Sequence, residues 1–239
     1  MRICFTPRAV TYTLKRCNVC RKEFPMTRVL FQGDSITDVG RSREDNSNIG
    51  RGYPHLVKAA LNFTKPEKYD FINRGISGNR IVDLYARIKS DIINLAPDFM
   101  SILIGVNDVA HEFYRHNGVD DTRFEKIYGM LIEEVREALP DIKILIMEPF
   151  VLPASATADK LPEGSYEEYR AEVEKRATVA KRIAEIYGLT FLPLQKLFDD
   201  NAAKTYPEYW LVDGVHPTEA GHALIAERWG MAFAKMMNE

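Results

Sequence analysis

The sequence predicts a single α/β domain in which helices cover both faces of a parallel β-sheet. Short apolar runs alternate along the chain with amphipathic stretches, as expected when each crossover between parallel strands carries a helix. The apolar runs are nearly continuous rather than alternating, which is typical of strands buried on both faces. The chain has 239 residues, of which 46% are hydrophobic, so it is long enough to bury one sizeable core.

Five apolar runs are the expected strands, and they lie at 28–32, 69–73, 99–105, 143–149 and 190–194. Apolar residues at helical spacing predict a helix over 124–139, which Pro140 ends. The same spacing predicts a helix over 81–92, and a last helix is expected from Thr218. Each of these helices would pack its apolar stripe against the sheet.

The first 25 residues differ from the rest, with six Lys or Arg against one Glu and no periodicity. We expect 1–25 to be a poorly ordered extension, with Met26 as an alternative start, and 26–239 to be the folded domain. Cys17 and Cys20 have the spacing of half a zinc site, but no second ligand pair follows nearby. No metal site is therefore predicted.

The composition also limits the possible binding partners and the expected cellular compartment. The net charge of −2 gives no basic footprint for nucleic acid or an anionic membrane, and no apolar run is long enough to span a bilayer. Three cysteines cannot build a disulfide framework, so a reducing, cytoplasmic compartment is expected. We therefore expect no nucleic-acid or membrane partner, while the presence of a homo-oligomer stays open.

Polar segments rich in glycine and aspartate lie where ligands bind in such a fold. In open α/β sheets the ligand site lies beyond the carboxyl ends of the strands. The first three strands are followed by the segments 33–35, 73–79 and 105–108, and 213–217 precedes the last helix. These four segments are therefore expected to form one site.

Their side chains fit the requirements of nucleophilic catalysis. A serine hydroxyl needs an adjacent base, so Ser35 is the candidate nucleophile, His216 its base, and Asp213 the group that orients the imidazole. A tetrahedral intermediate needs donors aimed at its oxyanion. The expected donors are the backbone N–H groups of Ser35 and Gly78 and the side-chain amide of Asn107. Gly78 suits this role because a missing Cβ lets the backbone approach closely.

Alternatives exist for several of these residues. Asp108 and His111 have the same spacing as Asp213 and His216, but we favour His216 because Pro217 and the following helix start would fix its loop. Gly78 could instead be a plain turn glycine, and Asn107 a helix cap. The remaining histidines are expected on the surface, at His55, His116 and His222. No G-x-S-x-G elbow is present, which argues against the α/β-hydrolase fold.

The four segments resemble the signatures of the SGNH hydrolases, also called GDSL esterases/lipases. The matching stretches are "GDSITD", "NRGISGN", "GVND" and "DGVHP", and the resemblance runs from about Met26 to the C-terminus. It implies a flavodoxin-like three-layer α/β/α sandwich with a five-stranded parallel sheet, and a serine hydrolase mechanism without a metal or other cofactor. The family's invariant residues map onto Ser35, Gly78, Asn107 and His216. Longer stretches look most like intracellular carbohydrate acetyl esterases, in particular acetylxylan esterases.

The expected function is thus a serine esterase that removes short acyl groups, in particular acetyl, from carbohydrate through an acyl-serine intermediate. The alternatives are a lysophospholipase or thioesterase of the same family, or a noncatalytic protein that binds a polar ligand. Substrate choice is expected to rest on loops at 39–53, 109–122 and 148–166, whose aromatic residues either contact the sugar or pack the loops. The candidate substrate contacts are Asp38, Arg41, His111, Phe113, Tyr114 and Phe150.

Overall fold

The computed structural model describes residues 26–155, 161 and 164–238. Its sheet has the strands β1 (Thr27–Gly33), β2 (Tyr69–Asn73), β3 (Phe99–Leu103), β4 (Lys143–Met147) and β5 (Thr190–Leu192). All neighbouring pairs are parallel, and the order is β2-β1-β3-β4-β5. This is the flavodoxin-like doubly wound order, so the predicted fold class is confirmed. The predictions for 1–25, including Cys17 and Cys20, lie outside the described residues.

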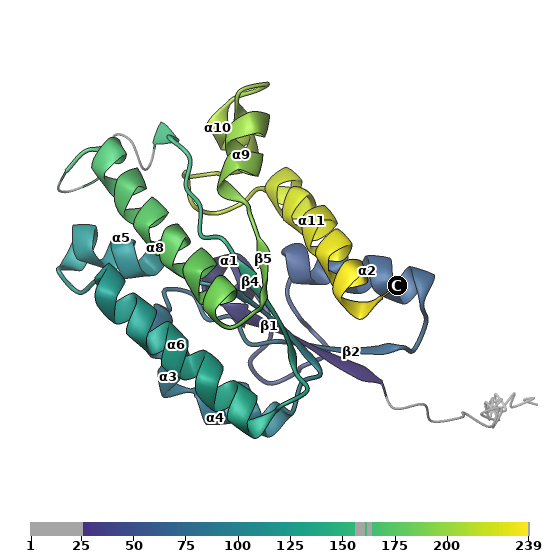
Figure 1. Ribbon diagram of the computed structural model, residues 1–239. Helices are drawn as coiled ribbons and strands as arrows, with labels where there is room; N and C mark the ends of the chain where they lie inside the picture. Colours follow the sequence, from purple (N-terminus) through teal and green to yellow (C-terminus); the bar gives the residue numbers. More distant parts are fainter. Residues whose placement is uncertain (1–25, 156–160, 162–163, 239) are drawn as a thin grey trace, which may run out of the picture.

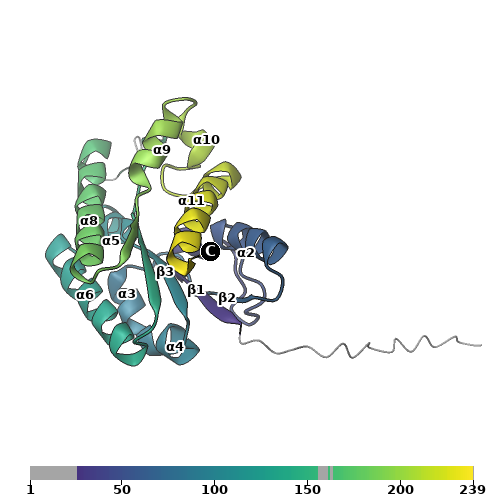
Figure 2. The same cartoon turned by 45° about the vertical axis from the view of Figure 1, so that its right-hand side comes forward.

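Helices cover both faces of the sheet (Figures 1 and 2). One face carries α2 (Tyr53–Thr64) and α11 (Glu219–Met237), and the other carries α3 (Ile81–Ala86), α4 (Ile88–Asp91), α6 (Asp121–Ala138) and α8 (Tyr166–Ile186). The helices α1 (Ser35–Asp38) and α5 (Val106–Arg115) follow β1 and β3, and α9 (Gln195–Ala202) and α10 (Pro207–Trp210) follow β5. Over the described ranges, no helix has the length and hydropathy needed to cross a bilayer.

The core is divided by the sheet into two layers. On β1, Val29 and Phe31 join the cluster beneath α2 and α11, whereas Leu30 joins the cluster beneath α3, α6 and α8. Successive side chains of a strand point to opposite faces, and here both faces are covered. This explains why the strands are continuous apolar runs in the sequence.

Aromatic packing fixes α11 on the sheet. Trp229 is fully buried, and its ring centroid lies 5.2 Å from that of Phe31, 5.4 Å from that of Phe99 and 4.9 Å from that of Phe233. Aromatic pairs of this kind contribute about 0.5–1.5 kcal/mol each beyond the area they bury. The packing also places the loop before α11, which carries Asp213 and His216.

The strands expected at 99–105, 143–149 and 190–194 each end two residues earlier, at Leu103, Met147 and Leu192. Two other predicted segments differ in their helical structure. The helix expected over 81–92 is divided at Arg87, which lies between α3 and α4 with φ −114° and ψ 19°. The Arg87 guanidinium donates to Gln32 Oε1, to the Arg74 carbonyl and to Asp91 Oδ2, each at 2.8 Å. These contacts hold the arginine at the break. The loop expected over 109–122 is helical as far as Arg115, within α5.

His222 was expected on the surface but is only 5% exposed, so this prediction is wrong. Its Nδ1 accepts a hydrogen bond of 3.1 Å from the Tyr53 N–H, at the start of α2, where Gly52 provides no side-chain cap. Burial lowers the pKa of His222 to about 4; the Glu219 carboxylate raises it and the charge on His216 lowers it. The imidazole is therefore a neutral acceptor that joins α11 to α2.

This contact should make stability depend on pH. The pKa of His222 in the folded protein, about 4, lies below the usual histidine value of about 6.5, so the unfolded chain binds the proton more readily. The stabilisation is then complete above about pH 6.5 and falls by up to roughly 3 kcal/mol as the pH drops toward 4. Chemical unfolding of the wild type and of His222→Asn, whose Oδ1 can still accept from Tyr53, should show a smaller pH dependence in the variant. Equal pH dependence in both proteins would contradict this account.

Candidate active site

The turn from β1 into α1 presents Ser35. A Cβ at Gly33 would lie 2.4 Å from the Leu103 carbonyl oxygen and 2.5 Å from Thr37 Oγ1, so only glycine fits there. Asp34 Oδ1 accepts a 3.0 Å hydrogen bond from the Ile36 N–H and caps α1. Glycine, aspartate and serine thus each have a separate role in this turn, and only the serine side chain is available for chemistry.

His216 lies against Ser35. The distance from Ser35 Oγ to His216 Nε2 is 2.9 Å, and that from His216 Nδ1 to Asp213 Oδ2 is 2.6 Å. Asp213 Oδ1 accepts from the N–H groups of Val215 at 3.0 Å and His216 at 2.8 Å, which folds the loop into a tight turn. The arrangement has the geometry of a nucleophile, a base and an orienting carboxylate.

Electrostatics favour a charged Asp213 beside a basic His216. Burial opposes ionisation of Asp213, but hydrogen bonds from the side chain and backbone of His216 outweigh it and lower the pKa of Asp213 to about 2. The hydrogen bond to Asp213 raises the pKa of His216 above its usual value, against the effect of burial. His216 is therefore a stronger base than a free imidazole.

Three groups could stabilise an oxyanion beside Ser35. Among the described residues, the backbone N–H groups of Ser35 and Gly78 donate to no acceptor. Gly78 has φ +80°, in the left-handed region that favours glycine. Asn107 Nδ2 donates one hydrogen to the Asn79 carbonyl at 3.2 Å, and its second amide hydrogen stays available.

A cavity of about 170 Å³ borders Asn107, Asp213 and His216. It is lined by Val106, Asn107, Ala110, Tyr114, Tyr169, Asp213, Val215 and His216. Tyr169, on α8, was not among the predicted site residues. It is 1% exposed and packs at 5.3 Å against Phe113. Tyr169 has the spacing of a core residue in an amphipathic helix, so no local signal identifies it as part of a site.

The predicted substrate contacts divide into two groups. Tyr114 lines the cavity and is 47% exposed, and His111 Nε2 lies 3.9 Å from the position of a Cβ at Gly78. Phe113 packs on Tyr169. Phe150, by contrast, is fully buried with its ring stacked on Phe198 at 4.3 Å, so it is a core residue, contrary to the predicted role.

Asp38 and Arg41 are not among the residues that line the cavity. They are 5% and 8% exposed, and their polar atoms bind the segment that precedes Gly78. Burial, with the nearby Arg43 charge, lowers the pKa of Arg41 to about 10, which leaves the guanidinium charged at neutral pH. Their predicted substrate contact is therefore replaced by contact with the protein itself.

The alternative pair of Asp108 and His111 is not formed. Asp108 is fully buried, and its Oδ1 accepts a 3.0 Å hydrogen bond from the Ile81 N–H at the start of α3. His111 Nδ1 is buried without a partner among the described residues. Burial and the Arg80 and Arg115 charges lower the pKa of His111, so it is a weaker base than His216.

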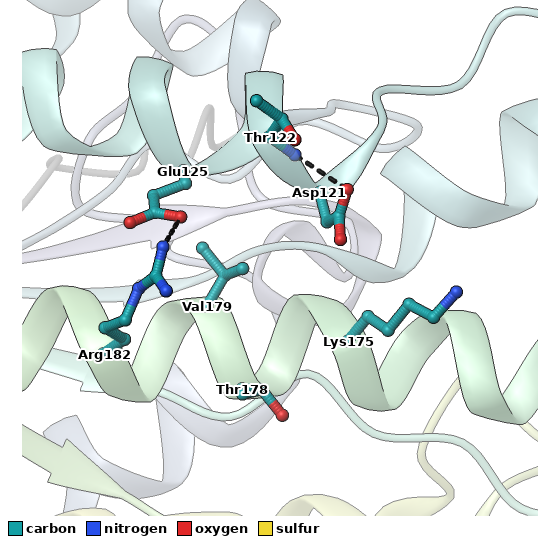
Figure 3. Close-up of a pocket in the computed structure, with 7 residues that line it drawn as sticks. All are labelled: Asp121, Thr122, Glu125, Lys175, Thr178, Val179 and Arg182. Carbon is teal, nitrogen blue, oxygen red and sulfur yellow. Dashed lines mark hydrogen bonds and ion pairs between the residues drawn. The ribbon is translucent and has the colours of Figure 1, made fainter.

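A second pocket, of about 310 Å³, lies between α6 and α8 (Figure 3). Arg182 pairs with Glu125 there, and the Asp121 carboxylate accepts from the Thr122 N–H. None of the candidate site residues Ser35, Gly78, Asn107, Asp213 and His216 lines it. In the part of the chain that the structure describes, no group of three or more His, Cys, Asp or Glu could hold a metal ion.

Comparison with known proteins defines the class. The chain belongs to the GDSL-like lipase/acylhydrolase family, because the model of that family matches residues 31–224. It is therefore a carboxylic ester hydrolase.

Individual relatives cover most of the chain. It is 34% identical over 210 residues to an acetylxylan esterase of Geobacillus stearothermophilus, covering 83% of this chain and 90% of that protein. The crystal structure of Axe2, an acetylxylan esterase of the same organism, has a TM-score of 0.73 and 32% identity, over 85% of this chain and 92% of Axe2. A Parabacteroides merdae protein described as a GDSL-like lipase has a TM-score of 0.77 and 34% identity, over 86% and 94% of the two chains.

Replacing Asp213 by Asn should change both the rate and the pH profile. The variant loses the carboxylate that raises the pKa of His216, so the acid limb of kcat/KM should move to lower pH. Because the amide also fails to hold the reactive tautomer, kcat should fall by roughly 10³–10⁴-fold. Hydrolysis of p-nitrophenyl acetate as a function of pH measures both effects. An acid limb at an unchanged pH would show that Asp213 does not set the basicity of His216.

Proposed function

We propose that this protein hydrolyses short-chain esters, in particular acetyl esters of carbohydrates, through an acyl-serine intermediate on Ser35. The observation that carries the proposal is the 2.9 Å contact of Ser35 Oγ with His216 Nε2, continued at 2.6 Å to Asp213. A serine without such a base is a weak nucleophile near neutral pH. A noncatalytic binding protein would have no need for the full arrangement.

Acylation begins when Ser35 Oγ attacks the ester carbonyl carbon and its proton passes to His216 Nε2. The carbonyl oxygen takes the electron pair and receives hydrogen bonds from the Ser35 and Gly78 N–H groups and from Asn107. The intermediate collapses, the C–O bond to the alcohol breaks, and His216 gives its proton to the leaving alcohol. Water then attacks the acyl group with His216 as base, which releases the acid and restores Ser35.

The size of the cavity favours a short acyl group. A volume of about 170 Å³ is well below the roughly 300–1,000 Å³ of pockets that hold drug-sized ligands. Val106, Ala110 and Tyr169 border this space. A long acyl chain would need an extended apolar cleft, whereas an acetyl group fits within these walls.

The relatives support the choice of substrate and of site residues. The curated relative at 34% identity is an acetylxylan esterase. Solved structures of Axe2 include catalytic mutants in which one serine or one aspartate is replaced by alanine. Ser35 and Asp213 are the corresponding residue types in the triad proposed here.

Covalent labelling tests the nucleophile. A fluorophosphonate probe should label the wild type at Ser35, and Ser35→Ala should lose both labelling and turnover of p-nitrophenyl acetate, because no other hydroxyl contacts a raised-pKa histidine in the described residues. Ser90→Ala, which changes an exposed serine on α4, is the matched control and should behave as the wild type. Labelling that persists in Ser35→Ala would exclude Ser35 as the nucleophile.

A panel of substrates tests which acyl group and which alcohol the enzyme prefers. Acetate release should be fastest from acetylated xylo-oligosaccharides or other acetylated sugars. In kcat/KM, p-nitrophenyl octanoate should react about 10-fold or more slowly than the acetate, because this small cavity offers a longer chain little apolar wall to contact. Lysophospholipids and acyl thioesters complete the panel. Activity on lysophospholipids alone would identify a lysophospholipase, and activity on acyl thioesters alone would identify a thioesterase. Either result would contradict the proposed carbohydrate esterase.

A further inference from the structure

We propose that Asp38 is a positioning residue, which holds the segment 75–79 so that the Gly78 N–H is aimed at the oxyanion. The inference rests on the function proposed above and adds a residue that acts through the backbone, without touching substrate. The carboxylate lies at the end of α1, the helix that begins with Ser35.

The Asp38 carboxylate binds the residue next to Gly78. Its Oδ2 accepts from the Ser77 N–H at 3.0 Å, from Ser77 Oγ at 3.2 Å and from Arg43 Nη2 at 2.6 Å. The Asp38 side chain is 7% exposed, whereas that of Arg43 is 50% exposed. One buried oxygen thus holds the backbone immediately before the oxyanion donor.

The same segment is fixed on either side of Gly78. The Gly75 carbonyl accepts from Arg41 Nε at 2.7 Å and from Arg43 Nη1 at 3.0 Å. A Cβ at Gly75 would lie 2.5 Å from the Asp38 N, so this backbone packs directly on the end of α1. After Gly78, the Asn79 carbonyl accepts from Asn107 Nδ2 at 3.2 Å.

A single turn of helix therefore sets the distance between the two halves of the site. Ser35, at the start of α1, supplies the hydroxyl and one oxyanion N–H, and Asp38, at its end, anchors the segment with the other N–H. A shift of about 1 Å in a catalytic group can cost about 100-fold in rate. Loss of the Asp38 carboxylate should therefore slow turnover while the triad stays intact.

The expected kinetic pattern separates positioning from a general loss of stability. Because the oxyanion contact forms only in the transition state, kcat and kcat/KM should fall together and KM should change little. The acid limb of the pH profile should stay in place, since the hydrogen bonds of His216 and Asp213 do not involve Asp38. If Asp38 only stabilised the fold, its substitution would lower the unfolding temperature without this kinetic pattern.

The test compares two substitutions at Asp38 with a control substitution that breaks a different ion pair. Asp38→Ala should lower kcat for p-nitrophenyl acetate by about 100-fold, and Asp38→Asn, which keeps one oxygen acceptor for the Ser77 N–H, by about 10-fold. The control is Asp70→Asn, which breaks the 2.8 Å pair of Asp70 with Arg28 near the amino ends of β2 and β1. Rates are measured where circular dichroism shows every variant folded, and the control should keep the wild-type kcat.

Three results would overturn the proposal: wild-type kcat in Asp38→Asn, an equal loss of kcat in Asp70→Asn, or an acid limb displaced in Asp38→Asn. Asp38→Asn has nearly the size of the native side chain, so it keeps the test valid if Asp38→Ala does not fold. Failure of the proposed function would appear differently, as hydrolysis that survives in Ser35→Ala.

Discussion

The hydrogen bond between Ser35 and His216 joins two segments that are 181 residues apart, and the rest of the site depends on it. One partner, Ser35, lies in the turn after β1, which is the strand between β2 and β3. The other lies in the loop before α11, which Trp229 packs onto β1 and β3 through Phe31 and Phe99. The aromatic core thus helps to position the loop that brings His216 to Ser35.

Three aspartates of the fold, Asp34, Asp108 and Asp213, differ in how far hydrogen bonds offset their burial. Asp213 receives bonds from the His216 ring and two backbone N–H groups, and its pKa falls to about 2. Asp34 is fully buried and its Oδ2 has no partner among the described residues, so burial raises its pKa to about 7. Burial likewise raises the pKa of Asp108. Of the three carboxylates, Asp213 is therefore the one that stays ionised next to the His216 imidazole.

Much of the architecture could be predicted because buried parallel strands are continuous apolar runs. The five strands were located this way, and the shared carboxyl edge of a parallel sheet explains why segments such as 33–35 and 105–108 were expected to meet. The comparisons confirm the family and the ester hydrolase class. The catalytic roles of Ser35, Asp213 and His216 stay predictions that the geometry supports.

The residues that were misplaced depend on contacts between distant segments. His222 is buried because α11 packs against α2, and its partner Tyr53 lies 169 residues away. Arg87 interrupts a predicted helix while it binds Gln32, 55 residues away. Phe150 follows a strand as a loop residue would, but it is buried in the core, where its ring stacks on Phe198. Helical or strand periodicity carries no information about such pairs.

The most direct test of the account is the detection of the acyl-enzyme itself. Rapid acid quenching of the wild type during turnover of an acetyl ester, followed by intact mass measurement and peptide mapping, should reveal one added acetyl group on the peptide that contains Ser35. The account predicts that this adduct forms and disappears at rates compatible with kcat. An acetyl group on another residue, or turnover without any covalent adduct when the chemical step of deacylation limits the rate, would contradict it.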